Sequence, residues 1–106
     1  MLRLRVLRPA RQEVRETASW YRADDQKLAR AFVDEIDRVV TFARRFPKGA
    51  TAIERIEDLE LRRFTTRVFP YFVIACDWQD ALVVLAVAHQ RREPGYWHPR
   101  LAIVRS

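Results

Sequence analysis

The chain has few of the residues on which small proteins often depend for a staple or a metal site. Its 106 residues include one cysteine, two histidines and two glycines. The single cysteine, Cys76, excludes an internal disulfide, and its apolar surroundings predict an inert buried thiol. The histidines are too few and too widely spaced for a metal centre, and two isolated glycines exclude a glycine-rich phosphate loop. We therefore expect neither a metal nor a cofactor.

Long apolar runs are also missing. No run approaches the ~18 residues that a membrane-spanning helix needs. The N-terminal segment MLRLRVLRPA lacks the apolar core of a secretory signal, which predicts a cytoplasmic protein. The length of the chain predicts one domain over residues 1–106.

Lysine is scarce although the chain is basic. Twenty basic residues against fourteen acidic ones give a net charge of +6, and only Lys27 and Lys48 are lysines. Arginine binds phosphate and carboxylate groups in bidentate geometry and stacks on aromatic rings. The net charge therefore favours anionic partners and carries no information about the fold. The alternative explanation is a GC-rich genome, which favours arginine codons whatever the partner.

The first half of the chain predicts one strand and two helices. Leu2, Leu4 and Val6 alternate with arginines, which is typical of a half-exposed strand. Apolar residues then recur at helical spacing over about 9–23 and again over about 26–45. Because the turn between the two helices is short, they should form an antiparallel hairpin.

The second half predicts three strands, over residues 59–67, 71–78 and 81–90. The last two should form a hairpin around a tight turn at residues 79–80, and the continuous apolar run at 82–88 predicts a buried central strand. The segments without a strong signal are expected as a loop, residues 48–58, and as a tail that packs or frays, residues 98–106. The sequence thus predicts an α+β fold in the order β-α-α-β-β-β, with the helical hairpin on one face of a mainly antiparallel four-stranded sheet.

The central strand ends in a cluster of polar and aromatic residues. His89 and Arg91 would share a face if the strand continued, and Arg92 follows them. After a Pro-Gly turn come Tyr96 and Trp97. Together with the arginines of the preceding strands, these residues could form a basic surface with aromatic sides, suited to a phosphate backbone and stacked bases. The plainer alternative is that strand ends become polar for solvation and that a lone histidine is structural.

Five short segments follow one another along the chain: Trp20–Tyr21, Phe46–Pro47, RRF at Arg62 to Phe64, FPY at Phe69 to Tyr71 and VAHQRREPGYW at Val87 to Trp97. Taken together and in this order, they resemble the RelE/ParE superfamily of toxins from type II toxin–antitoxin modules, often labelled plasmid stabilisation proteins. No single motif is specific, but the match covers nearly the whole chain and implies a similar fold.

The resemblance implies a growth inhibitor with one of two activities. RelE-like members are ribosome-dependent mRNA endoribonucleases, whereas ParE-like members inhibit DNA gyrase without hydrolysis. An RNA-cleaving member would use an acid or base and cations at the phosphate. The sheet lysines of RelE are absent here, because neither lysine lies on an expected strand. A third alternative is a nucleic-acid-binding module without toxicity. The candidate catalytic residues are His89, Arg91 and Tyr96, and the candidate residues for binding phosphate or a target are Arg62, Arg63, Arg67, Arg92 and Trp97.

The resemblance also implies a cognate antitoxin. Antitoxin segments of this kind are disordered alone and fold on the toxin, so they need a large apolar contact and complementary charge. We expect a small neighbouring-gene product with an acidic tail to cover the second-half sheet, near a groove of the helical hairpin. The alternative is that the arginines are only solvated and that the chain self-associates through an exposed sheet edge.

Overall fold

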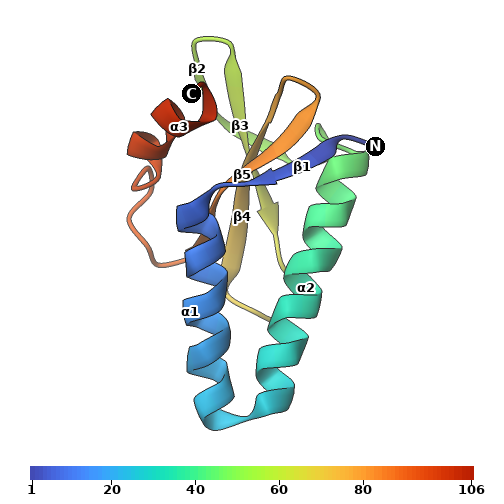
Figure 1. Ribbon diagram of the computed structural model, residues 1–106, viewed down its shortest axis with the longest axis vertical. Coiled ribbons are helices and arrows are strands. Elements are labelled where there is room, and N and C mark those ends of the chain that lie inside the picture. The colour runs from blue at the N-terminus through green and yellow to red at the C-terminus, as the bar shows by residue number, and fades with distance from the viewer.

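The computed structural model describes all 106 residues and has the α+β architecture that the sequence predicts (Figure 1). One sheet has the strand order β1-β5-β4-β3-β2, in which β1 is parallel to β5 and all other neighbours are antiparallel. The elements are β1 (Arg3–Val6), α1 (Arg8–Asp24), α2 (Gln26–Arg45), β2 (Thr51–Ile56), β3 (Leu59–Thr65), β4 (Tyr71–Trp78), β5 (Ala81–His89), a 3-10 turn (His98–Arg100) and α3 (Leu101–Val104).

The sheet has five strands and not four, because part of the expected loop at residues 48–58 is β2. This strand pairs with β3, but the register shifts between Ala52 and Glu54. The shift is a β-bulge, which interrupts the two-residue alternation of apolar side chains. Ile53 and Ile56 both pack against the core, yet they lie three residues apart in the sequence. The bulge thus explains why alternation did not reveal the strand.

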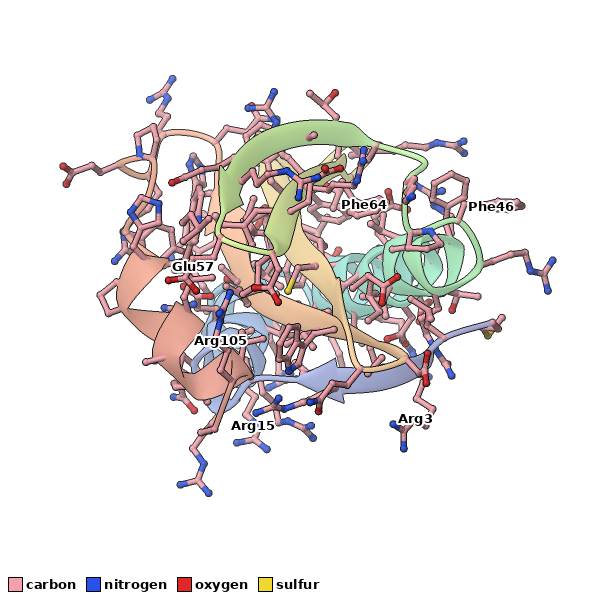
Figure 2. All side chains as sticks on the ribbon, turned by 90° about the horizontal axis from the view of Figure 1, so that it is seen from above. Arg3, Arg15, Phe46, Glu57, Phe64 and Arg105 are labelled. Carbon is pink, nitrogen blue, oxygen red and sulfur yellow. The ribbon has the colours of Figure 1, made fainter.

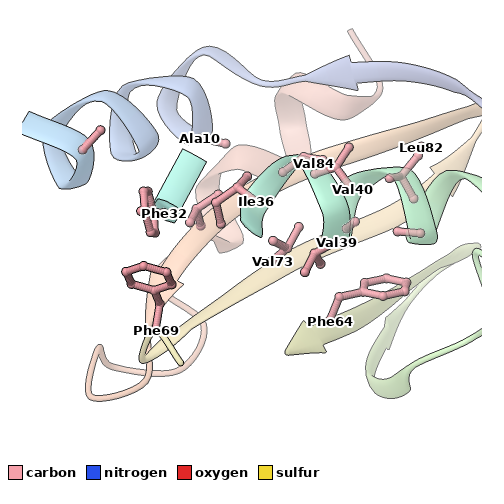
Figure 3. Close-up of a cluster of buried hydrophobic side chains, with 14 residues drawn as sticks. Ala10, Phe32, Ile36, Val39, Val40, Phe64, Phe69, Val73, Leu82 and Val84 are labelled. Carbon is pink, nitrogen blue, oxygen red and sulfur yellow. The ribbon is translucent and has the colours of Figure 1, made fainter. Parts of the chain in front are cut away.

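The helical hairpin covers one face of the sheet, as predicted, and its turn lies beyond the ends of the strands (Figure 1). Pro9 lies in the first turn of α1, and the Asp25 carboxylate caps α2 by accepting a hydrogen bond from the Lys27 backbone N–H at 2.9 Å. Phe32, Ile36 and other residues of the hairpin pack on β3, β4 and β5 (Figure 3). At its ends the expected apolar stripe differs, because Leu28 and Phe46 are exposed.

The opposite face is covered by the C-terminal segment, so the tail packs and does not fray. Trp97 and Val104 are buried in a second core, together with the side chains of β3, β4 and β5 that point away from the helical hairpin. The Arg5 guanidinium donates to the Val104 carbonyl at 2.8 Å. Arg105 reaches the β2–β3 turn and bonds to Glu57 at 2.6 Å (Figure 2). The C-terminal end of α3 is therefore tied to β1 through Arg5 and to the β2–β3 turn through Glu57.

The β4–β5 hairpin and the thiol follow the sequence prediction. Gln79 and Asp80 have φ values of 51° and 62°, the left-handed pair that a two-residue hairpin turn with the twist of the strands requires. Cys76 is buried, and burial, together with the neighbouring Asp77, raises the pKa of its thiol to about 11. No helix of the fold combines the length and the apolar character that crossing a membrane requires.

Replacing Leu85 by Ala should lower the free energy of unfolding by about 2–5 kcal/mol, because this fully buried side chain would leave a cavity in β5. Leu4 in β1 is 42% exposed and provides a matched control, for which the same change should cost less than about 1 kcal/mol. Urea unfolding of the two variants measures both values. Equal losses would show that β5 is not the interior strand of the fold.

Candidate functional site

The edge of β5 that faces β1 is only partly covered by a strand. β1 pairs with β5 as far as Val84, and the Leu7 backbone N–H makes the last backbone contact, to the Val84 carbonyl at 3.0 Å. Beyond this point the chain turns into α1. A second irregularity, the register shift opposite Ile74 and Ala75, bulges β5 at Leu85. The Leu85 carbonyl and the Val87 N–H therefore need side-chain hydrogen bonds.

Glu13 and Arg100 supply those hydrogen bonds. Glu13 on α1 accepts from the Val87 backbone N–H at 3.0 Å, and Arg100 donates to the Leu85 carbonyl at 2.9 Å. The two side chains also form a bidentate pair at 2.8 and 3.1 Å. Each is only 16% exposed, which places this ion pair largely out of solvent. The pair thus ties α1 and the C-terminal segment to the open edge of β5.

Tyr96 belongs to the same network. Its hydroxyl donates to the Glu13 carboxylate at 2.6 Å. The guanidinium of Arg92 lies 4.0 Å from the centre of the Tyr96 ring, and that of Arg100 lies 5.1 Å from it. Burial and the hydrogen bond to Glu13 raise the pKa of the Tyr96 phenol above its ordinary value. Tyr96 is therefore a neutral phenol whose hydroxyl proton is engaged in the hydrogen bond to Glu13.

The strand ends at His89, one residue earlier than the sequence predicts. The Arg92 N–H donates to the His89 carbonyl at 2.9 Å and closes a turn there. The Arg91 backbone N–H donates to Nδ1 of the His89 ring at 3.0 Å. Arg91 thus lies in a turn and not on the strand, so the two side chains do not share a strand face. The His89 ring packs edge-to-face on Tyr71 at 5.1 Å.

Four of the predicted site residues meet around one cavity of about 270 Å³ on the face away from the helical hairpin. They are Arg63, His89, Arg92 and Trp97. Phe72 also lines the cavity, and the Arg63 guanidinium lies 4.7 Å from the centre of its ring. His98 and Glu54 contact each other at 2.8 Å at the same cavity. The basic surface with aromatic walls that the sequence suggested is thus present in part.

Arg62, Arg67 and Arg91 lie outside this cavity. Arg62 shares the helix-bearing face with Phe64, donates to the Ala50 carbonyl at 2.6 Å and pairs with Glu60. Arg67 follows β3, where its backbone N–H donates to the Glu35 carboxylate at 2.5 Å. The predicted arginines are therefore divided between the two faces of the sheet.

Sequence analysis did not identify Glu13 or Arg100. For Glu13 a signal existed, because it lies three residues after Ala10 and four before Thr17, both of which belong to the expected apolar stripe of the first helix. A carboxylate on a buried helix face needs partners, which points to a structural or functional network. Arg100 gave no such signal, because residues 98–106 show neither helical nor strand periodicity from which its position could be predicted.

Comparisons with known proteins agree with this fold. The family model described as the ParE toxin of the type II toxin–antitoxin system parDE matches residues 4–94. A solved structure titled "Chromosomal ParDE TA system from P. aeruginosa" is similar, with a TM-score of 0.71 and 16% sequence identity. The similarity covers 84% of this chain and 96% of that chain, and at this identity it shows a shared fold alone. No curated protein matches the sequence.

Replacing Glu13 by Ala should lower the free energy of unfolding by about 3 kcal/mol or more, because Arg100 and the Val87 N–H would lose their acceptor in a largely buried setting. Glu16 on the same helix is exposed and bonds only to Gln12, so its replacement by Ala should cost less than about 1 kcal/mol. Denaturant unfolding distinguishes the two. A Glu13 variant as stable as the Glu16 variant would show that the hydrogen bonds of Glu13 to Arg100 and to the Val87 N–H do not stabilise the fold.

Proposed function

Because this chain belongs to the ParE toxin family of type II toxin–antitoxin systems, we propose that it inhibits growth by binding DNA gyrase and that it does not cleave RNA. The observation that carries the choice is the state of the candidate catalytic groups. Cleavage of RNA by attack of a 2′-hydroxyl needs a base, an acid for the leaving oxygen and a cation at the phosphate. The chain offers cations, but the candidate catalytic residues His89, Arg91 and Tyr96 do not form a matched acid and base.

Each candidate catalytic residue supports this interpretation. The Tyr96 hydroxyl donates a hydrogen bond to Glu13 and its pKa is raised, so it is poorly suited to proton transfer. His89 uses Nδ1 to accept the Arg91 N–H, which leaves a single ring nitrogen. Arg91 does not line the cavity that His89 lines. His89 has only one ring nitrogen that Arg91 does not engage, and it lies beside exposed arginines. The end of β5 is therefore better suited to binding a target than to a proton transfer by two of these candidate residues.

The proposed target-binding surface is the end of β5 and the turn that follows it. Arg91 and Arg92 are exposed there, His89 is half-buried, and the strand beneath them is buried along its whole length. A buried strand that presents exposed cations at its end is a suitable platform for a protein interface, where arginine is enriched among the residues that dominate affinity.

Expressed alone, the protein should arrest growth and inhibit gyrase supercoiling, while mRNA on translating ribosomes stays intact. The double variant His89→Ala/Arg91→Ala should raise the concentration needed to inhibit supercoiling roughly thirtyfold, the effect of losing an interface contribution of about 2 kcal/mol. Supercoiling assays and primer extension on mRNA from the same cultures measure the two activities.

The double variant Arg11→Ala/Arg15→Ala is the control, since it removes two exposed charges from α1 and should keep full activity. Cleaved mRNA with unaffected gyrase would reverse the proposal in favour of a ribosome-dependent ribonuclease. Full toxicity in the His89/Arg91 variant would show that the end of β5 is not part of the target-binding surface.

We also propose that a cognate antitoxin binds the groove between α2 and β3. This groove has a volume of about 480 Å³ and an apolar floor that includes Phe42 and Phe64. Arg38 and Arg67 line it as well. An acidic segment that folds on binding needs both an apolar contact and opposite charge, and this groove offers both.

Association with the antitoxin should depend on salt. Electrostatic steering between this chain of net charge +6 and an acidic segment loses its reach as screening increases. The association rate constant should therefore fall about tenfold or more between ~50 mM and ~500 mM salt. Stopped-flow measurement with the neighbouring-gene product gives this rate. A rate constant that does not change with salt, or no binding, would overturn the proposal.

A further inference from the structure

A second cavity lies beside His89, on the side of the helical hairpin, and three of the family-resembling segments converge on it. Its volume is about 410 Å³. Trp20 and Tyr21 come from the end of α1, Pro70 and Tyr71 from the start of β4, and His89 from the end of β5. The catalytic interpretation of the sequence used only His89 among these residues. We refer to this cavity, completed by Glu16 and Thr17, as the aromatic cup.

The rings of the cup stand nearly at right angles to one another. Trp20 and Tyr21 meet edge-to-face at 5.2 Å and 70°, and Tyr71 and His89 do so at 5.1 Å and 83°. Tyr21 is fixed from behind by Phe32 at 5.6 Å and by Phe69 at 5.3 Å. Such an arrangement of ring walls can present faces of negative electrostatic potential to a group between them.

The loop before Tyr71 contains a strained backbone position, and hydrogen bonds stabilise it. Val68 has φ of 72°, a left-handed conformation that is unfavourable for a β-branched residue. The buried Thr66 hydroxyl lies 2.8 Å from the Phe69 carbonyl and 2.9 Å from the Tyr71 carbonyl and holds the loop in this form. The wall formed by Tyr71 is therefore preorganised.

The cup lacks the basic residues that line other cavities of this chain. Four other cavities, with volumes between about 270 and 480 Å³, are each lined by at least two arginine or lysine residues. The cup has none of these, and Glu16 is its one carboxylate. In a chain of net charge +6, this absence leaves a site in which a cation meets aromatic faces and a negative charge.

Trp20 is the most accessible wall of the cup. It is 71% exposed, an unusual position for the largest apolar side chain in a folded protein. Tryptophan is enriched among the residues that dominate protein interfaces. An exposed tryptophan at the rim of a preorganised cavity is thus available to a partner.

We propose that the aromatic cup receives an arginine or lysine side chain of the toxin's target protein. The proposal rests on the proposed function, in which the chain acts by binding a protein. The guanidinium or ammonium group would lie against the rings of Trp20, Tyr21 and Tyr71, and the Glu16 carboxylate would balance its charge. A phosphate or carboxylate would meet Glu16 without a lysine or arginine to offset it. The cup thus complements the arginine-rich cavity on the other side of His89.

The pocket itself can be tested with N-acetyl-arginine amide, using the neutral isostere N-acetyl-citrulline amide as the control probe. In a ¹H–¹⁵N spectrum, the arginine probe should shift the Trp20 indole signal saturably and leave the buried Trp97 signal in place. Glu16→Gln should weaken binding roughly two- to fivefold, and Phe46→Ala, which removes another exposed aromatic residue, should not change it. Equal responses to both probes, or none at Trp20, would overturn the proposal.

The role of the cup in target binding is tested by gyrase inhibition. Trp20→Ala should raise the inhibitory concentration about tenfold or more, Trp20→Phe should raise it less, and Phe46→Ala should not raise it. If the Trp20→Ala variant inhibited gyrase as strongly as the wild type, the cup would not be the site that receives the target's cation. A Trp20-dependent dimer of this chain would overturn the proposal by assigning the cup to a second copy. A wild-type protein that binds the arginine probe but does not inhibit gyrase would contradict the proposed function and leave the cation site standing.

Discussion

The structure depends on how the exposed edge of β5 is closed. A parallel strand that must turn into a helix leaves its neighbour without backbone partners, and unpaired polar groups in a core are costly. Here Glu13 and Arg100 take the place of the missing strand residues at Val87 and Leu85. Because the same carboxylate also holds Tyr96, one closure fixes the first helix, the central strand and the C-terminal segment together.

The surface around the end of β5 has two parts, one on each side of His89. On one side lies a cavity with Arg63 and Arg92, and on the other lies the aromatic cup with Trp20 and Glu16. A target that presents acidic and basic groups at matching positions would engage both. Opposite charges on adjoining surfaces give orientation and specificity more than affinity, as the proposed binding of a single target protein requires.

The fold was largely predictable because its signals are local, whereas the site depends on contacts between distant segments. Periodicity revealed both helices, but the bulge beside Ile53 hid β2. Alternation along β3 already implied that Arg62 and Arg63 point to opposite faces, although the sequence interpretation grouped them. Glu13 stood out only as a charge on an apolar stripe, and its partners are 74 and 87 residues away. No single-sequence pattern reports a pairing of that range.

The most direct test of this account is the hydrogen-exchange rate of the Val87 amide in the wild type and in the variant Glu13→Ala, which removes the acceptor. If the Glu13 carboxylate closes the edge of β5, the wild-type amide should exchange only on global unfolding, and the variant should exchange faster at Val87 than at Val73, which lies between two strands. Equal protection of both amides in the variant would show that the edge is closed without Glu13, and it would contradict the account.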